Sequence, residues 1–152
     1  MSEILVLVEH ADGAVKKVTL ELLTLARSLG TPAAVWLGSG ASADALATLG
    51  EYGAEKVYVA DSADLDDYLV APKAEVLARV LADSGAGAVL IPSTAEGKEI
   101  AGRVAIKSGS GIITGNFSLE ESTNLAVLLR AGALPAKMNF LEERTIGPEL
   151  GQ

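Results

Sequence analysis

The sequence contains no cysteine. This absence excludes disulfide bonds, thiolate zinc sites, iron–sulfur clusters and a cysteine nucleophile, and it fits a reducing compartment. Long apolar runs are also absent: uncharged stretches such as residues 88–91 are far shorter than the roughly 20 residues that span a bilayer. Residues 1–3 lead directly into an apolar segment without a basic region, so we expect no signal peptide. Together these features predict a cytoplasmic protein.

Positive charge is scarce. The chain has 12 Lys and Arg residues against 20 Asp and Glu residues, which gives a net charge of −8. Phosphate binding needs a basic face, so this charge argues against nucleic acid and anionic membrane surfaces as partners. The single histidine, His10, cannot build a histidine-rich metal site, and no Ser–His–Asp set can be assigned. We interpret His10, next to Glu9 at the end of the first predicted strand, as structural, with catalysis as the alternative.

The pattern of apolar residues predicts the fold class. The chain has 152 residues and a hydrophobic content of 49%, enough for one folded domain. Strand-like apolar runs at residues 4–8, 33–37, 56–60 and 88–91 alternate with helical spacing over 15–29, 43–50, 72–81 and 100–105. This alternation predicts an α/β fold with a doubly wound, mostly parallel sheet and helices on both faces.

The C-terminal part of the chain has a different pattern. Ser118 and Glu121 have the spacing of a capping box, which predicts a helix from Leu119 to Arg130. The apolar face of this helix would be Leu125, Leu128 and Leu129. Weak alternation over residues 137–145 predicts one more strand, so the tail offers a helix and a strand to complete the sheet.

One turn is a candidate anion site. Residues 93–98 follow the predicted strand 88–91 and open a helix, and ligands of open α/β sheets bind at such strand ends. The candidate residues are Ser93, Thr94, Gly97 and Lys98. The alternative is a plain helix-start turn. The segment is not a Walker loop, because the upstream glycine and the spacing are missing.

Three other features favour structural interpretations. Residues 38–40 (Gly-Ser-Gly) follow the wrong strand for a dinucleotide fingerprint, so we interpret them as a plain turn. An acidic stretch lacks the glycine and distal Glu of a calcium loop, which predicts a solvated loop and no metal site; its members are Asp61, Asp64, Asp66 and Asp67. Trp36 and Tyr58, on neighbouring strands, are predicted to serve packing.

Three segments resemble the N-terminal domain of electron transfer flavoprotein alpha subunits: residues 4–10 (ILVLVEH), 94–103 (TAEGKEIAGR) and 107–114 (KSGSGIIT). The resemblance covers residues 1 to about 114. It implies a heterodimeric electron carrier whose flavin sits mainly in a C-terminal domain that we do not find in this sequence. We therefore expect no bound FAD and no normal binding of a beta subunit. In that family the beta subunit uses an equivalent of the 93–98 turn for AMP, whereas the alpha subunit usually does not.

The tail resembles SecD, a subunit of the bacterial protein-export machinery. The matching segments are residues 115–121 (GNFSLEE), 125–135 (LAVLLRAGALP) and 142–151 (EERTIGPELG). They are similar to the end of the first extracytoplasmic domain of SecD. We place the junction between Gly109 and Gly115 and expect a single α/β domain built from residues 1–114 and 115–152.

These resemblances lead to the functional prediction. A chain built from two unrelated parents is interpreted as a recombined or engineered chimera, with a natural gene fusion as the alternative. We expect no catalytic residues, no native activity and self-association into a homo-oligomer through apolar surface left by the lost partner. The alternative is an alpha-type module in flavin-dependent electron transfer, or weak binding of AMP or another nucleotide.

Overall fold

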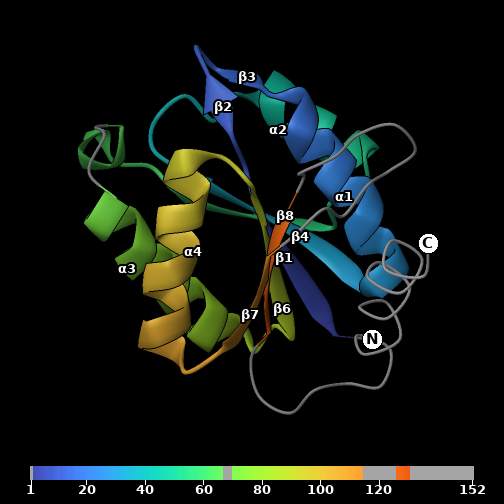
Figure 1. The fold of residues 1–152 in the computed structure, drawn as a ribbon. Coiled ribbons are helices and arrows are strands. Elements are labelled where there is room, and N and C mark those ends of the chain that lie inside the picture. The colour runs from blue at the N-terminus through green and yellow to red at the C-terminus, as the bar shows by residue number, and fades with distance from the viewer. Residues whose placement is uncertain (1, 67–69, 115–125, 131–152) are drawn as a thin grey trace, which may run out of the picture.

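The computed structural model describes residues 2–66, 70–114 and 126–130. The elements run in the order β1 (Glu3–Leu7), β2 (His10–Ala11), β3 (Ala14–Val15), α1 (Lys17–Leu29), β4 (Thr31–Leu37), α2 (Ala43–Glu51), β5 (Lys56–Ala60), the 3-10 turn η1 (Ala63–Leu65), α3 (Val70–Ser84), β6 (Ala88–Pro92), α4 (Ala95–Ser108), β7 (Gly111–Thr114) and β8 (Ala126–Arg130). The main sheet has the order β5–β4–β1–β6–β8–β7 (Figure 1).

Four of these strands form the parallel sheet that the sequence predicts. Strand β1 pairs with β4 on one side and with β6 on the other, and β4 pairs with β5, all in parallel. Strands β1, β4 and β6 are mostly continuous apolar runs, as expected for strands that are covered on both faces, whereas β5 at the edge is only partly buried. The predicted fold class is confirmed.

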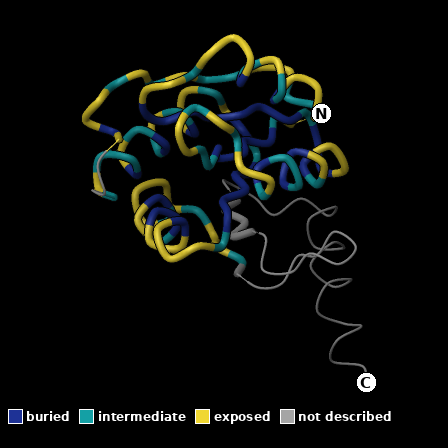
Figure 2. Tube along the Cα trace, turned by 90° about the horizontal axis from the view of Figure 1, so that it is seen from above, coloured by how far each residue is buried: buried dark blue, intermediate teal, exposed yellow. Residues whose placement is uncertain are grey.

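Helices cover both faces of the sheet. Helices α1 and α2 lie on one side and α3 and α4 on the other (Figure 1). Successive side chains of β1 point to opposite faces, so Val6 belongs to the core under α1 and α2 while Leu5 belongs to the core under α3 and α4. Both residues are completely buried. Figure 2 shows that buried residues concentrate in the centre of the molecule, along the strands.

The predicted helix from Leu119 to Arg130 is wrong over residues 126–130. Residues Ala126–Arg130 form strand β8, which pairs antiparallel with β6 and with β7. A five-residue apolar run does not by itself distinguish a strand from a helix. As a strand, this run pairs its backbone with β6 on one side and with β7 on the other, which a helix cannot do. Residues 119–125 and the predicted strand at 137–145 lie outside the described residues.

A small hairpin between β1 and α1 was not predicted, because the helical spacing appeared to begin at Val15. Strands β2 and β3 pair antiparallel. Their turn contains Asp12 (φ 52°) and Gly13 (φ 80°), the Asp-Gly pair that favours a tight hairpin turn. The hairpin lies at the carboxyl end of β1. Within the described part of the chain, no helix is both long and apolar enough to cross a membrane.

Candidate functional site

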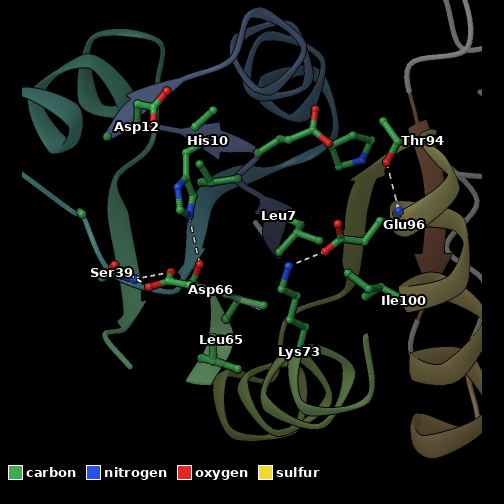
Figure 3. Close-up of a pocket in the computed structure, with 18 residues that line it drawn as sticks. Leu7, His10, Asp12, Ser39, Leu65, Asp66, Lys73, Thr94, Glu96 and Ile100 are labelled. Carbon is green, nitrogen blue, oxygen red and sulfur yellow. Dashed lines mark hydrogen bonds and ion pairs between the residues drawn. The ribbon is translucent and has the colours of Figure 1, made fainter. Parts of the chain in front are cut away.

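A cavity of about 470 Å³ lies at the carboxyl ends of β1, β4 and β6 (Figure 3). The chain leaves β1 toward β4 on one side and returns to β6 on the other, so the cavity lies at the point where the strand order reverses. Open α/β sheets bind ligands at this position. The lining residues are Leu7, Val8, Glu9, His10, Ala11, Asp12, Gly13, Leu37, Ser39, Gly40, Leu65, Asp66, Lys73, Pro92, Thr94, Glu96, Gly97 and Ile100.

His10 forms one wall of the cavity. Its ring stacks on Trp36, with ring centroids 4.0 Å apart and an interplanar angle of 11°. Its Nε2 lies 2.9 Å from the Leu37 carbonyl oxygen and donates to it. The fully buried Thr19 fixes the preceding residue, because its Oγ1 accepts from the Glu9 amide at 2.8 Å. The structure therefore places His10 at the mouth of the sheet, with one ring nitrogen already committed to the backbone.

Ser39 and Asp66 meet at a second wall. The Ser39 amide donates to Asp66 Oδ1 at 2.9 Å, and Ser39 Oγ donates to Asp66 Oδ2 at 2.6 Å. These two hydrogen bonds lower the pKa of Asp66 below its usual value, and positive charge at His10 and Lys73 adds to the effect. Ser39 follows β4 and Asp66 follows η1, so the contact joins two loops 27 residues apart in the sequence.

Lys73 of α3 and Glu96 of α4 form an ion pair between the two helices. Lys73 is the only Lys or Arg among the described residues that line the cavity. The same lining set contains four carboxylates, Glu9, Asp12, Asp66 and Glu96. The electrostatic environment of the cavity is therefore negative overall, and its one cation already has an anionic partner.

The predicted anion-site residues are divided between the cavity and the surface. Thr94 and Gly97 line the cavity, whereas the half-buried Ser93 and the exposed Lys98 are not among the lining residues. Thr94 caps α4, because its Oγ1 accepts from the Gly97 amide at 3.0 Å. A Cβ at position 97 would lie 2.0 Å from the Pro92 carbonyl oxygen, so only glycine allows this close approach of helix and strand.

Sequence reasoning missed three polar lining residues that form contacts at the cavity: Ser39 and Asp66, which bond each other, and Lys73, which pairs with Glu96. Ser39 was interpreted as part of a plain turn and Asp66 as part of a solvated loop. The position of residues 38–40 directly after a buried strand was the available signal for Ser39. No local pattern marks Asp66 and Lys73, because Asp66 reaches the cavity from the residue after η1 and Lys73 from the first turn of α3.

The acidic stretch and the two aromatic residues can also be placed in the structure. Among the described residues, no group of three or more His, Cys, Asp or Glu side chains is arranged to hold a metal ion, and Asp67 lies outside the described residues. Trp36 is fully buried in the core under α1 and α2. Tyr58 is partly buried against the core under α3 and α4, and its hydroxyl donates to the Glu3 carboxylate at 3.0 Å. Both aromatic residues therefore serve packing, as predicted.

Comparison with known proteins gives two distinct similarities. The alpha subunit of the electron transfer flavoprotein from Mycobacterium tuberculosis is 44% identical over 158 aligned residues, which cover 90% of this chain and 50% of that protein. The alpha subunit from Mycobacterium leprae is 49% identical over 122 residues, 80% of this chain and 38% of that protein. The protein translocase subunit SecD of Rhodobacter capsulatus is 80% identical over 46 residues, 30% of this chain and 8% of SecD.

The SecD similarity falls on the C-terminal part of the chain and the flavoprotein similarity on the N-terminal part. The electron transfer flavoprotein domain matches residues 4–132, which extends the flavoprotein similarity beyond Thr114 and through strand β8. The chain spans about half the length of the flavoprotein alpha subunits it matches. With this match over most of its length, the chain belongs to the electron transfer flavoprotein domain family and carries a SecD-like C-terminal segment.

Proposed function

We propose that this chain is a recombined flavoprotein-type domain without catalytic activity of its own. The observation that carries the proposal is that polar groups around the cavity are already hydrogen-bonded or ion-paired within the chain. Asp66 is held by Ser39 and Lys73 is paired with Glu96. His10 Nε2 is bonded to the Leu37 carbonyl. General acid–base catalysis needs a group that can reach a substrate proton, and each of these groups already has a partner within the chain.

The charge of the cavity supports a related proposal, that these residues do not bind FAD tightly. A pyrophosphate would meet four carboxylates and a single lysine that is already paired. Burying like charges together is unfavourable unless cations compensate them.

An absorption spectrum of the purified protein tests both statements. We expect no flavin bands, and we expect reconstitution with FAD to leave the flavin free after gel filtration. Stoichiometric FAD that stays with the protein, or reduction of such a flavin by an acyl-CoA dehydrogenase, would contradict the proposal.

A second candidate is an alpha-type module that takes part in flavin-dependent electron transfer. It is favoured by the match to residues 4–132 and by relatives that are named as alpha subunits. This candidate predicts that the chain binds the complementary subunit of the Mycobacterium tuberculosis flavoprotein. Co-elution of the two on gel filtration would support it and would count against the first proposal, which predicts separate peaks.

Any nucleotide affinity is proposed to be weak and to depend on the first turn of α4. The turn supplies a helix N-terminus, which favours anions, but the Gly97 amide is taken by Thr94 and Glu96 adds negative charge. We expect a Kd for AMP of about 1 mM or weaker by calorimetry. Lys98→Ala should weaken it further, whereas Lys17→Ala, an equal change of charge on α1, should not. Micromolar binding that Lys98→Ala leaves unchanged would exclude this site.

Self-association stays a prediction. The described apolar residues that remain exposed include Ile106 on α4 and Ile112 on the edge strand β7. We propose a homo-oligomer, and light scattering coupled to gel filtration measures the mass directly. A monomeric mass at all concentrations would contradict it.

A further inference from the structure

The turn at Gly38, Ser39 and Gly40 holds a carboxylate in a forked arrangement (Figure 3). The Ser39 amide donates to one oxygen of Asp66 and the Ser39 hydroxyl donates to the other, at 2.9 and 2.6 Å. Two donors on two oxygens define both the position and the orientation of the anion, and hydrogen bonds to an ionised acceptor are stronger than neutral ones. The turn thus already recognises an oxyanion, which belongs to the chain itself.

The backbone of the turn is suited to this approach. Gly38 has φ of 109° and Gly40 has φ of 90°, a region that side chains rarely allow. A Cβ at position 38 would lie 2.5 Å from Asp66 Oδ1 and would push the carboxylate out. Turns with positive-φ residues and exposed amides form concave anion sites in other proteins.

Within a cavity lining that is negative overall, two groups favour an anion at the Ser39 turn. His10 and Lys73 both lower the pKa of Asp66, so positive charge at either residue acts on the bound oxygens. Ser39, Gly40 and Asp66 all line the cavity, which leaves the turn accessible to a ligand. Asp66 is exposed, and exposed ionic contacts are weak enough to be displaced.

We propose that this turn is an oxyanion-binding site that the Asp66 carboxylate occupies, and that it accepts a small carboxylate or phosphate group when Asp66 is displaced. Asp66 acts as an internal competitor. If it holds the turn about 99% of the time, the apparent affinity for an external anion falls about 100-fold. The site is separate from the α4 turn of the proposed function and does not depend on it.

Removing the competitor tests the inference. Inorganic phosphate and sodium acetate are titrated separately into ¹⁵N-labelled protein, and the amide signal of Ser39 is followed by NMR. We expect Asp66→Ala to bind at least one of these anions about 10-fold or more tighter than the wild type, with the shift centred on Ser39. Comparing the two titrations distinguishes a carboxylate site from a phosphate site.

Three matched variants complete the design. Asp61→Ala removes the same charge from an exposed position of the same connection, outside the cavity lining, and should leave the affinity at the wild-type level. Asp66→Asn removes the charge but keeps the shape, and should give a smaller gain than Asp66→Ala. Adding Ser39→Ala to Asp66→Ala removes one of the two donors and should reverse most of the gain.

Several outcomes would overturn the inference. One is an affinity for both anions in Asp66→Ala and Asp66→Asn that equals that of Asp61→Ala. Another is a saturable shift centred on the amides of Gly97 and Lys98 instead of Ser39. That result would support the α4 turn as the anion site while excluding the Ser39 turn. The dispersion of the NMR spectrum shows in each case whether the variant is folded.

Discussion

The two flanks of the main sheet are built by different means. On one flank, β5, β4, β1 and β6 run parallel, with a packed core on each face. On the other flank, β8 runs antiparallel between β6 and β7, and β7 forms the edge of the sheet. Ile112 on β7 is 44% exposed, whereas Leu90 on β6 is 1% exposed. Burial of side chains on both faces stabilises the first flank, and backbone pairing connects the second flank to it.

The SecD-like part of the chain contributes to the antiparallel flank. Strand β8 lies in the C-terminal part of the chain that matches SecD, and it is also the strand that joins β7 to β6. Strand β8 of this segment therefore occupies an internal position in a sheet of the flavoprotein family. A strand with a neighbour on each side satisfies the backbone groups of both neighbours, so its loss affects more than its own residues.

Truncation after Thr114 should have the largest effect. It removes β8, which leaves β6 as an unpaired edge and β7 without a partner. Such edges favour aggregation, and net domain stability is only about 5–15 kcal/mol. We expect an insoluble or largely unfolded chain, measured by circular dichroism and thermal melting.

A point variant separates the strand from the rest of the tail. Leu128 lies opposite both Leu90 and Ile113, and Leu128→Pro removes a backbone donor from this internal strand, so it should lower the melting temperature of the full chain. A truncated chain that melts cooperatively at the temperature of the full chain would show that residues 1–114 fold alone and that the tail is dispensable.

The second prediction compares the two flanks through one apolar residue on each. Leu90→Ala should destabilise the protein by about 2–5 kcal/mol, because its side chain is buried in the core under α1 and α2. Ile112→Ala, a comparable truncation on β7, should change stability by no more than about 0.5 kcal/mol. Urea unfolding of both variants measures the difference. Equal losses of stability in the two variants would mean that the Ile112 side chain is as well packed as Leu90 and would contradict the comparison.

The third prediction concerns the connection between β6 and α4. Gly97→Ala should cost about 1–3 kcal/mol, because the added Cβ would lie 2.0 Å from the Pro92 carbonyl and must displace the helix or the strand end. Gly102→Ala is the matched control in the same helix: no atom lies within 4 Å of the new Cβ, so it should stabilise by about 0.5–1 kcal/mol. Similar destabilisation in both variants would indicate that helix α4 is sensitive at every position and that the contact with Pro92 is not special.

The parallel flank was predictable for the same reason that it is stable. Apolar runs such as residues 4–8 are buried on both faces, and a strand that is buried in this way can be identified from its continuous apolar sequence. The antiparallel flank was not predictable. The spacing of Ser118 and Glu121 fits a helix cap and the spacing of Leu125, Leu128 and Leu129 fits a helix face, whereas residues 126–130 form a strand. Residues 126–130 form a strand because they pair with β6 and β7, and such pairing with other strands produces no pattern in the local sequence.

The cavity residues also divide into those that the sequence could identify and those that it could not. Thr94 and Gly97 could be identified because they directly follow a buried strand in the sequence. The contacts of Ser39 with Asp66, and of Lys73 with Glu96, join residues 27 and 23 positions apart. The tertiary arrangement of loops and helix N-termini at the carboxyl end of the sheet sets such pairs, and no local sequence pattern predicts them.

The smallest expected effect lies on the outer surface of the parallel flank, between α3 and α4. Lys107 Nζ contacts Glu75 Oε1 at 2.8 Å, and the hydrogen bond and charge of Lys107 lower the pKa of Glu75 below its usual value. Lys107→Met should raise the pKa of Glu75 toward the usual value, which ¹³C NMR of the side-chain carboxyl measures directly. Lys98→Met, the same change at another exposed position of α4, should leave the pKa of Glu75 unchanged.

The sign of the stability effect follows from linkage. A carboxylate with a lowered pKa in the folded state stabilises the fold above the pKa of the unfolded chain, and this contribution is lost as pH falls through the folded-state pKa. The wild type should therefore melt slightly above Lys107→Met at neutral pH, and the two should converge in acid. The difference should also shrink at high salt, because both side chains are largely exposed. An equal pKa of Glu75 in both proteins would show that the contact does not persist in solution. In that case α3 and α4 are held together by their apolar core and by the Lys73–Glu96 ion pair.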